Sequence, residues 1–344
     1  MKSQVTLKEL ARKLGIATST VSRALKDNTE ISIETRIRVK KLATELNYEP
    51  NALALSLRRS KTYTIGVILP ELVHFFFSTV ISGIEDVTFS KEYNVILCQS
   101  NESLEREISN CKALFNHRVD GIIACISKET TNYNHFIALQ EKGIPLVFVD
   151  RENPVDASKI ISGDFNGAYD ATQYLLKSGC KRIIHLAGPQ NLVLSQERMN
   201  GFLKAHQEYG IATDENQIVR CGGGETHEAF EIVRNLIEKK YLFDGIFAVN
   251  DMAAVGALKA VQSAKLRVPE DVSIIGYSDW ALCTFISPPL TTVQQKGYEM
   301  GTKAAELLLK EMHSKDTFIE PSIIVLPTKL ILRESTRILI QNDY

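Results

Sequence analysis

The sequence predicts a small all-α domain followed by a larger α/β body with two doubly wound parallel sheets. Two observations lead to this fold class. In residues 6–25, apolar side chains recur at helical spacing on both sides of a glycine. From Tyr63 onward, short apolar runs alternate with helical segments, and the alternation occurs twice. Such alternation is typical of parallel sheets with crossover helices, and its repetition indicates two lobes.

The first predicted helix covers residues 7–14, where apolar side chains recur at i, i+3, i+4 and i+7. Thr6, with Glu9 three residues later, has the spacing of a capping box. Gly15 follows, where a reversal of the chain needs a residue that tolerates positive φ. The sequence therefore predicts two helices joined by a tight turn.

The second helix has an apolar side and a polar side. Its polar side consists of hydrogen-bonding side chains without negative charge: Thr18, Ser19, Ser22, Arg23 and Lys26. A helix of this kind fits the DNA major groove, where base edges offer donors and acceptors. A solvated helical hairpin is the alternative. A third helix is predicted from an N-cap at Ser32 to Leu46, and Asn47 and Pro50 end it.

Charge separates the head of the chain from its body. Residues 1–62 contain 13 basic and 6 acidic side chains, whereas the remainder contains 27 basic and 35 acidic ones. A total net charge of −1 therefore conceals a basic head on an acidic body. This distribution is the electrostatic signature of a nucleic-acid-binding module, and it favours DNA binding over the solvated hairpin.

The overall composition is that of an ordinary globular protein, with 44% hydrophobic and 24% charged residues. No apolar run is long enough for a membrane span, and the N-terminus does not resemble a signal peptide. Six scattered cysteines show no metal-binding or disulfide spacing and are expected to be buried thiols in a reducing compartment. We therefore expect a cytoplasmic protein with no metal, no cofactor and no membrane partner.

The segments VTLKELARKLGIATSTVSRALKD and TRIRVKKLATELNYEPNALALSLRRSKTYTIGV make the chain resemble the LacI/GalR family of bacterial transcriptional regulators. The resemblance covers essentially the whole chain. It implies a homodimeric repressor that binds a palindromic operator in double-stranded DNA, under the control of a small-molecule effector. Ala17 stands where the family usually has a serine, so the cap or phosphate contact of that serine is missing unless Thr18 replaces it.

The resemblance also assigns the DNA contacts, with Thr18, Ser19 and Arg23 on the base-reading positions. Residues 51–59 are either a flexible linker or the family's hinge helix, which forms on the operator and pairs with its twin. In that hinge helix, Leu57 enters the minor groove as a wedge. The predicted DNA-contacting and hinge residues are Thr6, Thr18, Ser19, Thr20, Ser22, Arg23, Asn51, Ala54, Leu57 and Arg58.

The body is expected to have the periplasmic-binding-protein-like fold of the family. Strands are predicted within 64–70, 94–98, 120–126, 145–150, 181–188, 244–250 and 272–277. The chain is expected to cross between lobes at 287–295, to form a helix near 296–313, and to cross again near 323–333. The predicted boundaries are 1–50 for the head, 51–62 for the hinge and 63–340 for the body. The N-lobe takes about 63–162 and 292–325, and the C-lobe about 163–291 and 326–340.

Ligands of doubly wound sheets bind beyond the carboxyl ends of the strands, here between the lobes. Phe76 or Phe77 matches an aromatic contact of the family, although a run of Phe is also ordinary helix core. Asp150 matches a ligand position, with helix capping or lobe bridging as the alternative. Arg198 matches an arginine that binds ligand hydroxyls or carboxylates, with a surface ion pair as the alternative.

Further candidates follow the later strands. Asn250 is the expected ligand contact just past a strand, and Asp251 is expected to cap the next helix. Trp280, the only tryptophan, either stacks on a ligand ring or packs between the lobes. The full set of predicted effector contacts is Phe76, Phe77, Asp150, Arg198, Asn250, Ser278, Asp279 and Trp280. The expected effector class is a sugar or sugar derivative.

Two departures from the family concern this site. Ser278 stands where the family often has an aspartate, and Gly224 stands where it often has a stacking aromatic. These departures leave the individual sugar open.

A solute-binding protein and a sugar kinase are the two alternatives to a repressor. A solute-binding protein would need an export signal in place of the basic head. A sugar kinase would need a phosphate-binding glycine loop, and the glycines at 222–224 lack the P-loop context. The chain is therefore not expected to be an enzyme. No heptad segment of the kind that makes tetramers follows Leu332, so a dimer is expected.

Overall fold

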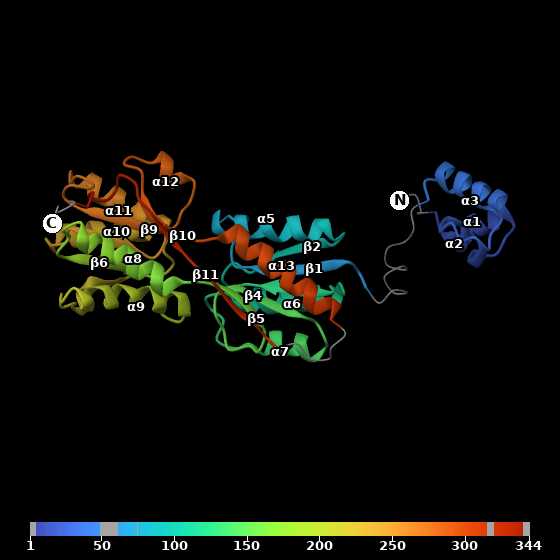
Figure 1. The fold of residues 1–344 in the computed structure, drawn as a ribbon, viewed down its shortest axis with the longest axis horizontal. Coiled ribbons are helices and arrows are strands. Elements are labelled where there is room, and N and C mark those ends of the chain that lie inside the picture. The colour runs from blue at the N-terminus through green and yellow to red at the C-terminus, as the bar shows by residue number, and fades with distance from the viewer. Residues whose placement is uncertain (1–4, 49–60, 74, 315–319, 340–344) are drawn as a thin grey trace. The chain divides into compact units, whose positions relative to one another are not determined.

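The computed structural model describes residues 5–48, 61–73, 75–314 and 320–339. They form two compact units that divide after Tyr63 (Figure 1). The smaller unit contains helices α1 (Leu7–Leu14), α2 (Thr18–Leu25) and α3 (Ile33–Glu45). Its core is small, with Leu10, Val21 and Val39 fully buried where the three helices meet.

Local signals explain where these helices begin and end. The Thr6 hydroxyl accepts a hydrogen bond from the Glu9 amide at the start of α1, and Gly15 ends that helix with a φ of 67°. The Ser32 hydroxyl accepts from the Thr35 amide at the start of α3. At the start of α2, Ala17 occupies the capping position and no side chain caps the helix, so Thr18 does not supply the cap of the missing serine.

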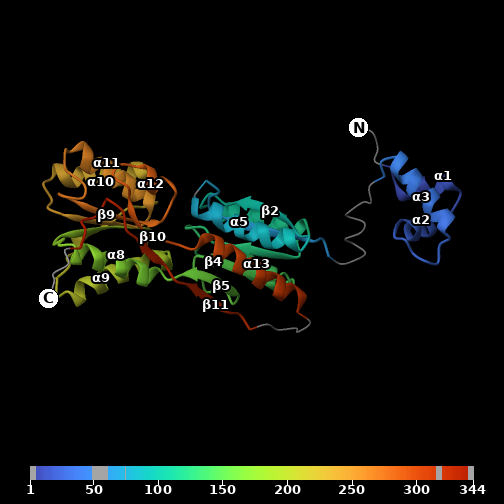
Figure 2. The same cartoon turned by 45° about the horizontal axis from the view of Figure 1, so that its top comes forward.

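The first sheet of the body has the strand order β11-β5-β4-β3-β1-β2, and all its strands are parallel. Its strands are β1 (Thr64–Leu69), β2 (Asn94–Gln99), β3 (Gly121–Ala124), β4 (Leu146–Asp150), β5 (Ser158–Ser162) and β11 (Ile323–Leu326). Helices α5 (Phe75–Ser90) and α13 (Gly297–His313) pack together on one face (Figure 2). Helices α6 (Leu104–Asn116) and α7 (Asn134–Glu141) cover the other face.

The second sheet has the order β12-β10-β9-β8-β6-β7 and is parallel except for β12, which runs antiparallel to β10. Its strands are β6 (Ile183–Ala187), β7 (Ile218–Arg220), β8 (Gly245–Ala248), β9 (Ser273–Ser278), β10 (Thr291–Gln294) and β12 (Lys329–Ile331). The main helices are α8 (Asp164–Lys177) and α9 (Val193–Glu208) on one face, and α10 (Thr226–Glu238) and α11 (Asp251–Ser263) on the other.

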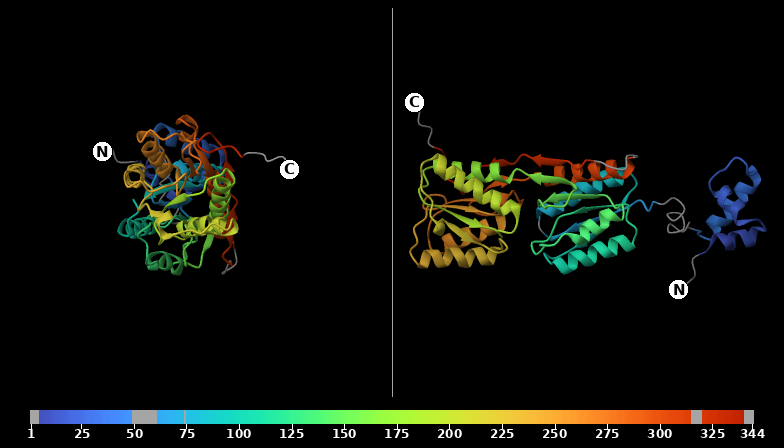
Figure 3. Two further views of the ribbon diagram at one scale, coloured as in Figure 1. Left: turned by 90° about the vertical axis from the view of Figure 1, so that its left-hand side faces the viewer. Right: turned by 90° about the horizontal axis from the view of Figure 1, so that it is seen from below.

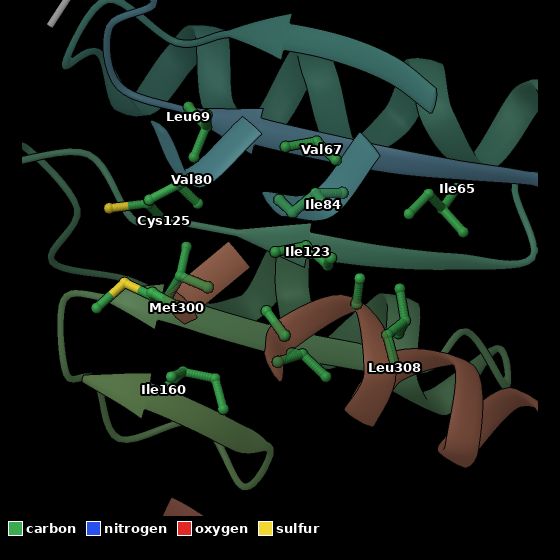
Figure 4. Close-up of a cluster of buried hydrophobic side chains, with 14 of the residues drawn as sticks. Ile65, Val67, Leu69, Val80, Ile84, Ile123, Cys125, Ile160, Met300 and Leu308 are labelled. Carbon is green, nitrogen blue, oxygen red and sulfur yellow. The ribbon is translucent and has the colours of Figure 1, made fainter. Parts of the chain in front are cut away.

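Alternation along β1 places Ile65, Val67 and Leu69 on one face of the first sheet, as predicted for a strand buried on both sides. Figure 4 shows these side chains packed with others from the neighbouring strands and from α5 and α13, Met300 and Leu308 among them. A matching layer forms on the opposite face around Ile68. Short elements complete the body: a 3-10 helix η1 (Glu215–Gln217) and helix α12 (Leu282–Phe285).

The predicted two-lobed fold is confirmed, and the described chain crosses between the two sheets after β5, after β10 and after β11. Strand β10 pairs with β9, so the chain leaves the second lobe after Gln294 and not at residue 292. Five of the described strands were not predicted: β5 and β7, and also β10, β11 and β12, which lie within the segments expected only to cross between the lobes. In the described residues no helix is long and apolar enough to cross a membrane, and none of the six cysteines forms a disulfide.

Candidate functional site

The polar face of α2 forms the candidate DNA-reading surface. Thr18, Ser19 and Arg23 are all exposed, while Val21 and Ala24 on the opposite side are buried in the head. The Arg23 guanidinium lies 3.3 Å from the Glu30 carboxylate, and both side chains are more than half exposed (59% and 71%). An ion pair this open is weak, so Arg23 is available to another acceptor.

The other predicted DNA contacts have mixed positions. Thr20 and Ser22 are half-buried on α2, and the Thr6 hydroxyl caps α1. The four hinge predictions, Asn51, Ala54, Leu57 and Arg58, lie outside the described residues.

A cleft of about 250 Å³ lies in the body where strand ends of the two lobes face each other. Figure 3 shows the two lobes and the strand segments that join them. Seven of the eight predicted effector residues line the cleft: Phe76, Phe77, Asp150, Arg198, Asn250, Ser278 and Trp280. The lining also includes polar residues that were not predicted, among them Glu102, Lys128, Arg151, Ser195 and Gln295.

Arg198 is almost fully buried, with 4% of its surface exposed, so the alternative of a surface ion pair is wrong. Its Nε and Nη2 donate to the Asp164 carboxylate at 2.8 and 2.6 Å, and its Nη1 donates to the Val249 carbonyl at 2.6 Å. The guanidinium lies 3.7 Å from the centre of the Tyr277 ring. These contacts hold the guanidinium in one orientation at the cleft wall, with N–H groups beyond those three bonds left for a ligand.

Asp150 ends β4 in the left-handed region of the backbone, with a φ of 66°, which is strained for a non-glycine residue. Its side chain is buried in the cleft wall. Burial raises the pKa of Asp150 to about 6, against the opposing influence of Arg151. The Asp164 carboxylate raises this pKa further, and Arg198 lowers it.

The N-lobe wall contains a second arginine, Arg151, of whose side chain 11% is exposed. Arg151 donates through two nitrogens to the two oxygens of Glu102, both at 2.7 Å, and to the Ile126 carbonyl at 2.8 Å. Glu102 also accepts from the backbone amide of Lys128 at 2.7 Å. Each lobe therefore presents an arginine fixed by a carboxylate and a carbonyl, an arrangement that keeps donors rigid.

The loop of Lys128 is held from behind by Glu107, a fully buried carboxylate of α6. Glu107 accepts hydrogen bonds from the Ser127 amide at 2.6 Å and from the Thr130 hydroxyl at 2.7 Å. The His135 ring lies 2.9 Å from the same carboxylate. This network determines where Lys128 enters the cleft.

The lobes are joined at three places around the cleft. Beside the crossings, Gln295 donates to the Ser162 hydroxyl at 3.1 Å and accepts from the Ser278 hydroxyl at 2.9 Å. The Asn191 amide donates to the Lys128 carbonyl. The rings of Phe75 and Trp280 lie 6.4 Å apart, from α5 of one lobe to the loop after β9 of the other. Trp280 thus packs between the lobes and also lines the cleft.

Two sequence expectations need correction. Asp279 is not among the lining residues; its carboxylate binds Arg333 at 2.7 Å and Gln294 at 2.8 Å. The cap of α11 is Asn250, whose oxygen accepts from the Ala253 amide at 2.8 Å, and not Asp251. The capping role leaves the Asn250 amide nitrogen for the cleft.

Gly224 lines the cleft with a φ of 70°. A side chain at this position would be strained by the positive φ, and its Cβ would lie 2.5 Å from the Asn250 amide nitrogen and displace it. The sequence did not indicate the lining residues Glu102 and Lys128, which folded loops bring to the cleft, nor Arg151 and Gln295, although these two directly follow β4 and β10.

Comparisons with known proteins agree with this geometry. Residues 6–51 match the model "Bacterial regulatory proteins, lacI family", and residues 172–336 match "Periplasmic binding protein-like domain". The chain is 32% identical over 332 residues to the ribose operon repressor of Halalkalibacterium halodurans, covering 96% of this chain and 97% of that protein. It is 35% identical over 312 residues to the transcriptional repressor PurR of Vibrio atlanticus, covering 90% and 93%.

Among solved structures, the lac repressor dimer bound to operator and the anti-inducer ONPF has a TM-score of 0.84. The match has 25% identity and covers 97% of this chain and 99% of that one. Members of this family are DNA-binding transcriptional repressors and not enzymes. With a basic helix-turn-helix head, a two-lobed body and relatives over nearly its whole length, this chain belongs to the LacI family of bacterial regulatory proteins.

Proposed function

We propose that this chain is a dimeric repressor whose operator affinity is controlled by a sugar or sugar derivative bound between the lobes. The observation that carries the proposal is the cleft, in which two fixed arginines face a buried carboxylate beside apolar walls. Such a repressor acts on chromosomal DNA, so we place it in the cytoplasm.

On the DNA side, the proposal assigns base contacts to Thr18, Ser19 and Arg23, with Thr6, Thr20 and Ser22 near the phosphates. The exposure of the first three and the basic charge of the head support it. Leu57 is assigned the minor-groove wedge of the hinge, with Asn51, Ala54 and Arg58 beside it. Two-fold symmetry of the dimer would be mirrored in a palindromic site.

The effector class follows from the size and chemistry of the cleft. A volume of about 250 Å³ corresponds to roughly eight water molecules, enough for one monosaccharide. Asp150 accepts, Arg198 donates, and Phe76 and Trp280 offer apolar faces to C–H groups. Because Arg151 and Arg198 are each already paired with a carboxylate, the remaining groups favour a neutral polyol over a phosphorylated ligand.

Control of DNA binding requires that the effector distinguish two lobe arrangements. The ligand changes operator affinity only by its differential affinity for them, typically about 1–3 kcal/mol, and DNA must affect ligand binding equally. Such a change would break the contacts that Gln295, Asn191 and Phe75 make between the lobes. We propose that the sugar acts as an inducer, so that its binding releases the operator.

The test begins with selection of genomic fragments by the purified full chain and sequencing of the recovered sites. Operator affinity is then measured with and without D-ribose and a panel of other monosaccharides, with purine bases as a separate arm. We expect a palindromic site, binding that weakens steeply with salt, and release by one sugar. Tighter operator binding with a sugar would reverse the sign, and a response to purine bases alone would contradict the sugar class.

A further inference from the structure

Ser195 lies in the first turn of α9, one helical turn before Arg198. Only 1% of its surface is exposed, and the residue lines the cleft. Within the described part of the chain its hydroxyl oxygen has no hydrogen-bond partner. A buried hydroxyl without a partner is costly, because it has given up its bonds to water.

Other buried hydroxyls in the helices of this body do not share this feature. Thr88, Thr172 and Ser178 each donate, at 2.8–2.9 Å, to a backbone carbonyl three or four residues earlier. Such back-bonding is the ordinary solution for a serine or threonine in a helix. Ser195 departs from it at a position where α9 lines the cleft.

The surroundings of Ser195 leave room for its hydroxyl. Gly188 follows β6 directly opposite, and a Cβ there would lie 2.7 Å from the Ser195 oxygen. Ser195 and Arg198 are three residues apart on α9, so their side chains occupy the same face of the helix. The Arg198 guanidinium therefore lies beside an uncommitted hydroxyl in the same wall.

We propose that Ser195 is a specificity-determining contact that hydrogen-bonds a hydroxyl of the effector next to the group bound by Arg198. A ligand hydroxyl suits this position because it both donates and accepts, as the serine does. This inference rests on the proposed effector cleft and adds a ligand position that the sequence comparison did not indicate. A ligand without a hydroxyl at that position leaves Ser195 unsatisfied and is discriminated against.

The test compares Ser195→Ala with Ser178→Ala in the full chain. Each variant is titrated calorimetrically with the monosaccharide panel and with deoxy analogues of any sugar that binds. We expect Ser195→Ala to weaken binding of the hydroxylated sugar by about 3- to 10-fold, as for loss of one neutral hydrogen bond. One deoxy analogue should bind the wild type and the Ser195 variant equally.

Unfolding measurements separate a ligand contact from a structural role. Ser195→Ala removes an unsatisfied group, so its unfolding midpoint should equal or exceed that of the wild type. Ser178→Ala removes a bonded hydroxyl, so its midpoint should fall while its sugar affinity stays unchanged. Equal sugar affinity in wild type and Ser195→Ala would overturn the role of Ser195 but not the proposed effector cleft. If no sugar in the panel binds, or if Arg198→Ala binds as well as the wild type, the proposed effector cleft fails with it.

Discussion

Two arginines illustrate how differently the two units of this protein hold their functional groups. Arg23 on the head is paired at 3.3 Å with Glu30, and 59% of its side chain is exposed. Arg198 in the body is 4% exposed and binds Asp164 and the Val249 carbonyl at 2.6–2.8 Å. Arg23 is free to exchange its partner for a DNA base. Arg198 is preorganised, and breaking its bonds would leave a buried charge unpaired.

The difference shows that placing a side chain at a binding site does not determine how much that side chain contributes to stability. An exposed pair contributes little, so substitutions at Arg23 should change recognition without changing folding. A buried pair contributes through the penalty of breaking it, so substitutions at Arg198 should change both. The predictions below test this contrast, beginning with the largest expected effect.

Arg198→Ala should abolish the effector response and lower the free energy of unfolding by about 3–5 kcal/mol, because it leaves the Asp164 carboxylate buried without its partner. Arg234→Ala, which removes an exposed arginine of the same lobe, is the matched control. Adding Asp164→Asn to Arg198→Met should restore much of the stability but not the response. A full effector response in the double variant would show that the guanidinium does not bind the ligand.

Asp150→Asn should change how stability depends on pH. In the folded chain the pKa of Asp150 is about 6, compared with its ordinary value of 3.8. Between these values the native state retains a proton that the unfolded state has lost, so stability falls as pH rises from about 4 to about 6. Between pH 4 and pH 7 the free energy of unfolding of the variant should therefore rise, relative to that of the wild type, by on the order of 3 kcal/mol.

Denaturant unfolding of both proteins across that pH range measures the gain. Comparing the two proteins at each pH removes the contribution of the buried carboxylate Asp251, whose pKa burial also raises. Parallel stability profiles would mean that Asp150 stays ionised. In the wild type, sugar affinity should also fall as the pH drops below 6, because a protonated carboxyl is a weaker acceptor.

Arg23→Ala should lose about 1–3 kcal/mol of discrimination at one base pair per half-site while the head remains folded. Arg38→Ala is the charge-matched control, since Arg38 is also exposed in the head but lies on α3. Affinities for the selected operator and for random DNA give the discrimination directly. Equal losses on both DNAs in the Arg23 variant would reduce this residue to a phosphate contact.

Glu30→Gln should have the smallest effect. Because both members of the Arg23–Glu30 pair are exposed, the free energy of unfolding should stay within about 0.5 kcal/mol of the wild type. Operator affinity should rise slightly, since one negative charge near the reading helix is removed. A clear loss of stability would show that the exposed pair holds the head together.

Most of the fold was predictable because it depends on periodicity. The head helices follow their caps and apolar faces, and seven strands follow runs of Val and Ile. Strand β5 was not predicted because it begins with the polar residues Ser158 and Lys159. In the fold, the Lys159 ammonium donates hydrogen bonds to the Val155 and Ala157 carbonyls. Strand β7 escaped because it has only three residues. In both cases the tertiary contacts outweigh the local pattern.

Strand ends indicated only part of the cleft, because Arg151 and Gln295, which directly follow β4 and β10, were not predicted. Asp279 follows β9, but positive φ angles at Ser278 and Asp279 turn the chain, and the carboxylate binds Arg333. Glu102 and Arg151 are 49 positions apart and meet only because β2 and β4 lie in one sheet. Pairings of that kind depend on strand order, which periodicity does not specify.

The contact between Phe75 and Trp280 has a practical consequence. Trp280 is the only tryptophan in the sequence, and its ring lies against an aromatic ring of the opposite lobe. Any rotation of one lobe away from the other would separate the two rings and admit solvent to the indole. Excitation that is selective for tryptophan over the eleven tyrosines therefore reports on a single indole in the cleft wall. A stopped-flow trace of the indole emission would record, in real time, how quickly the body responds to a sugar.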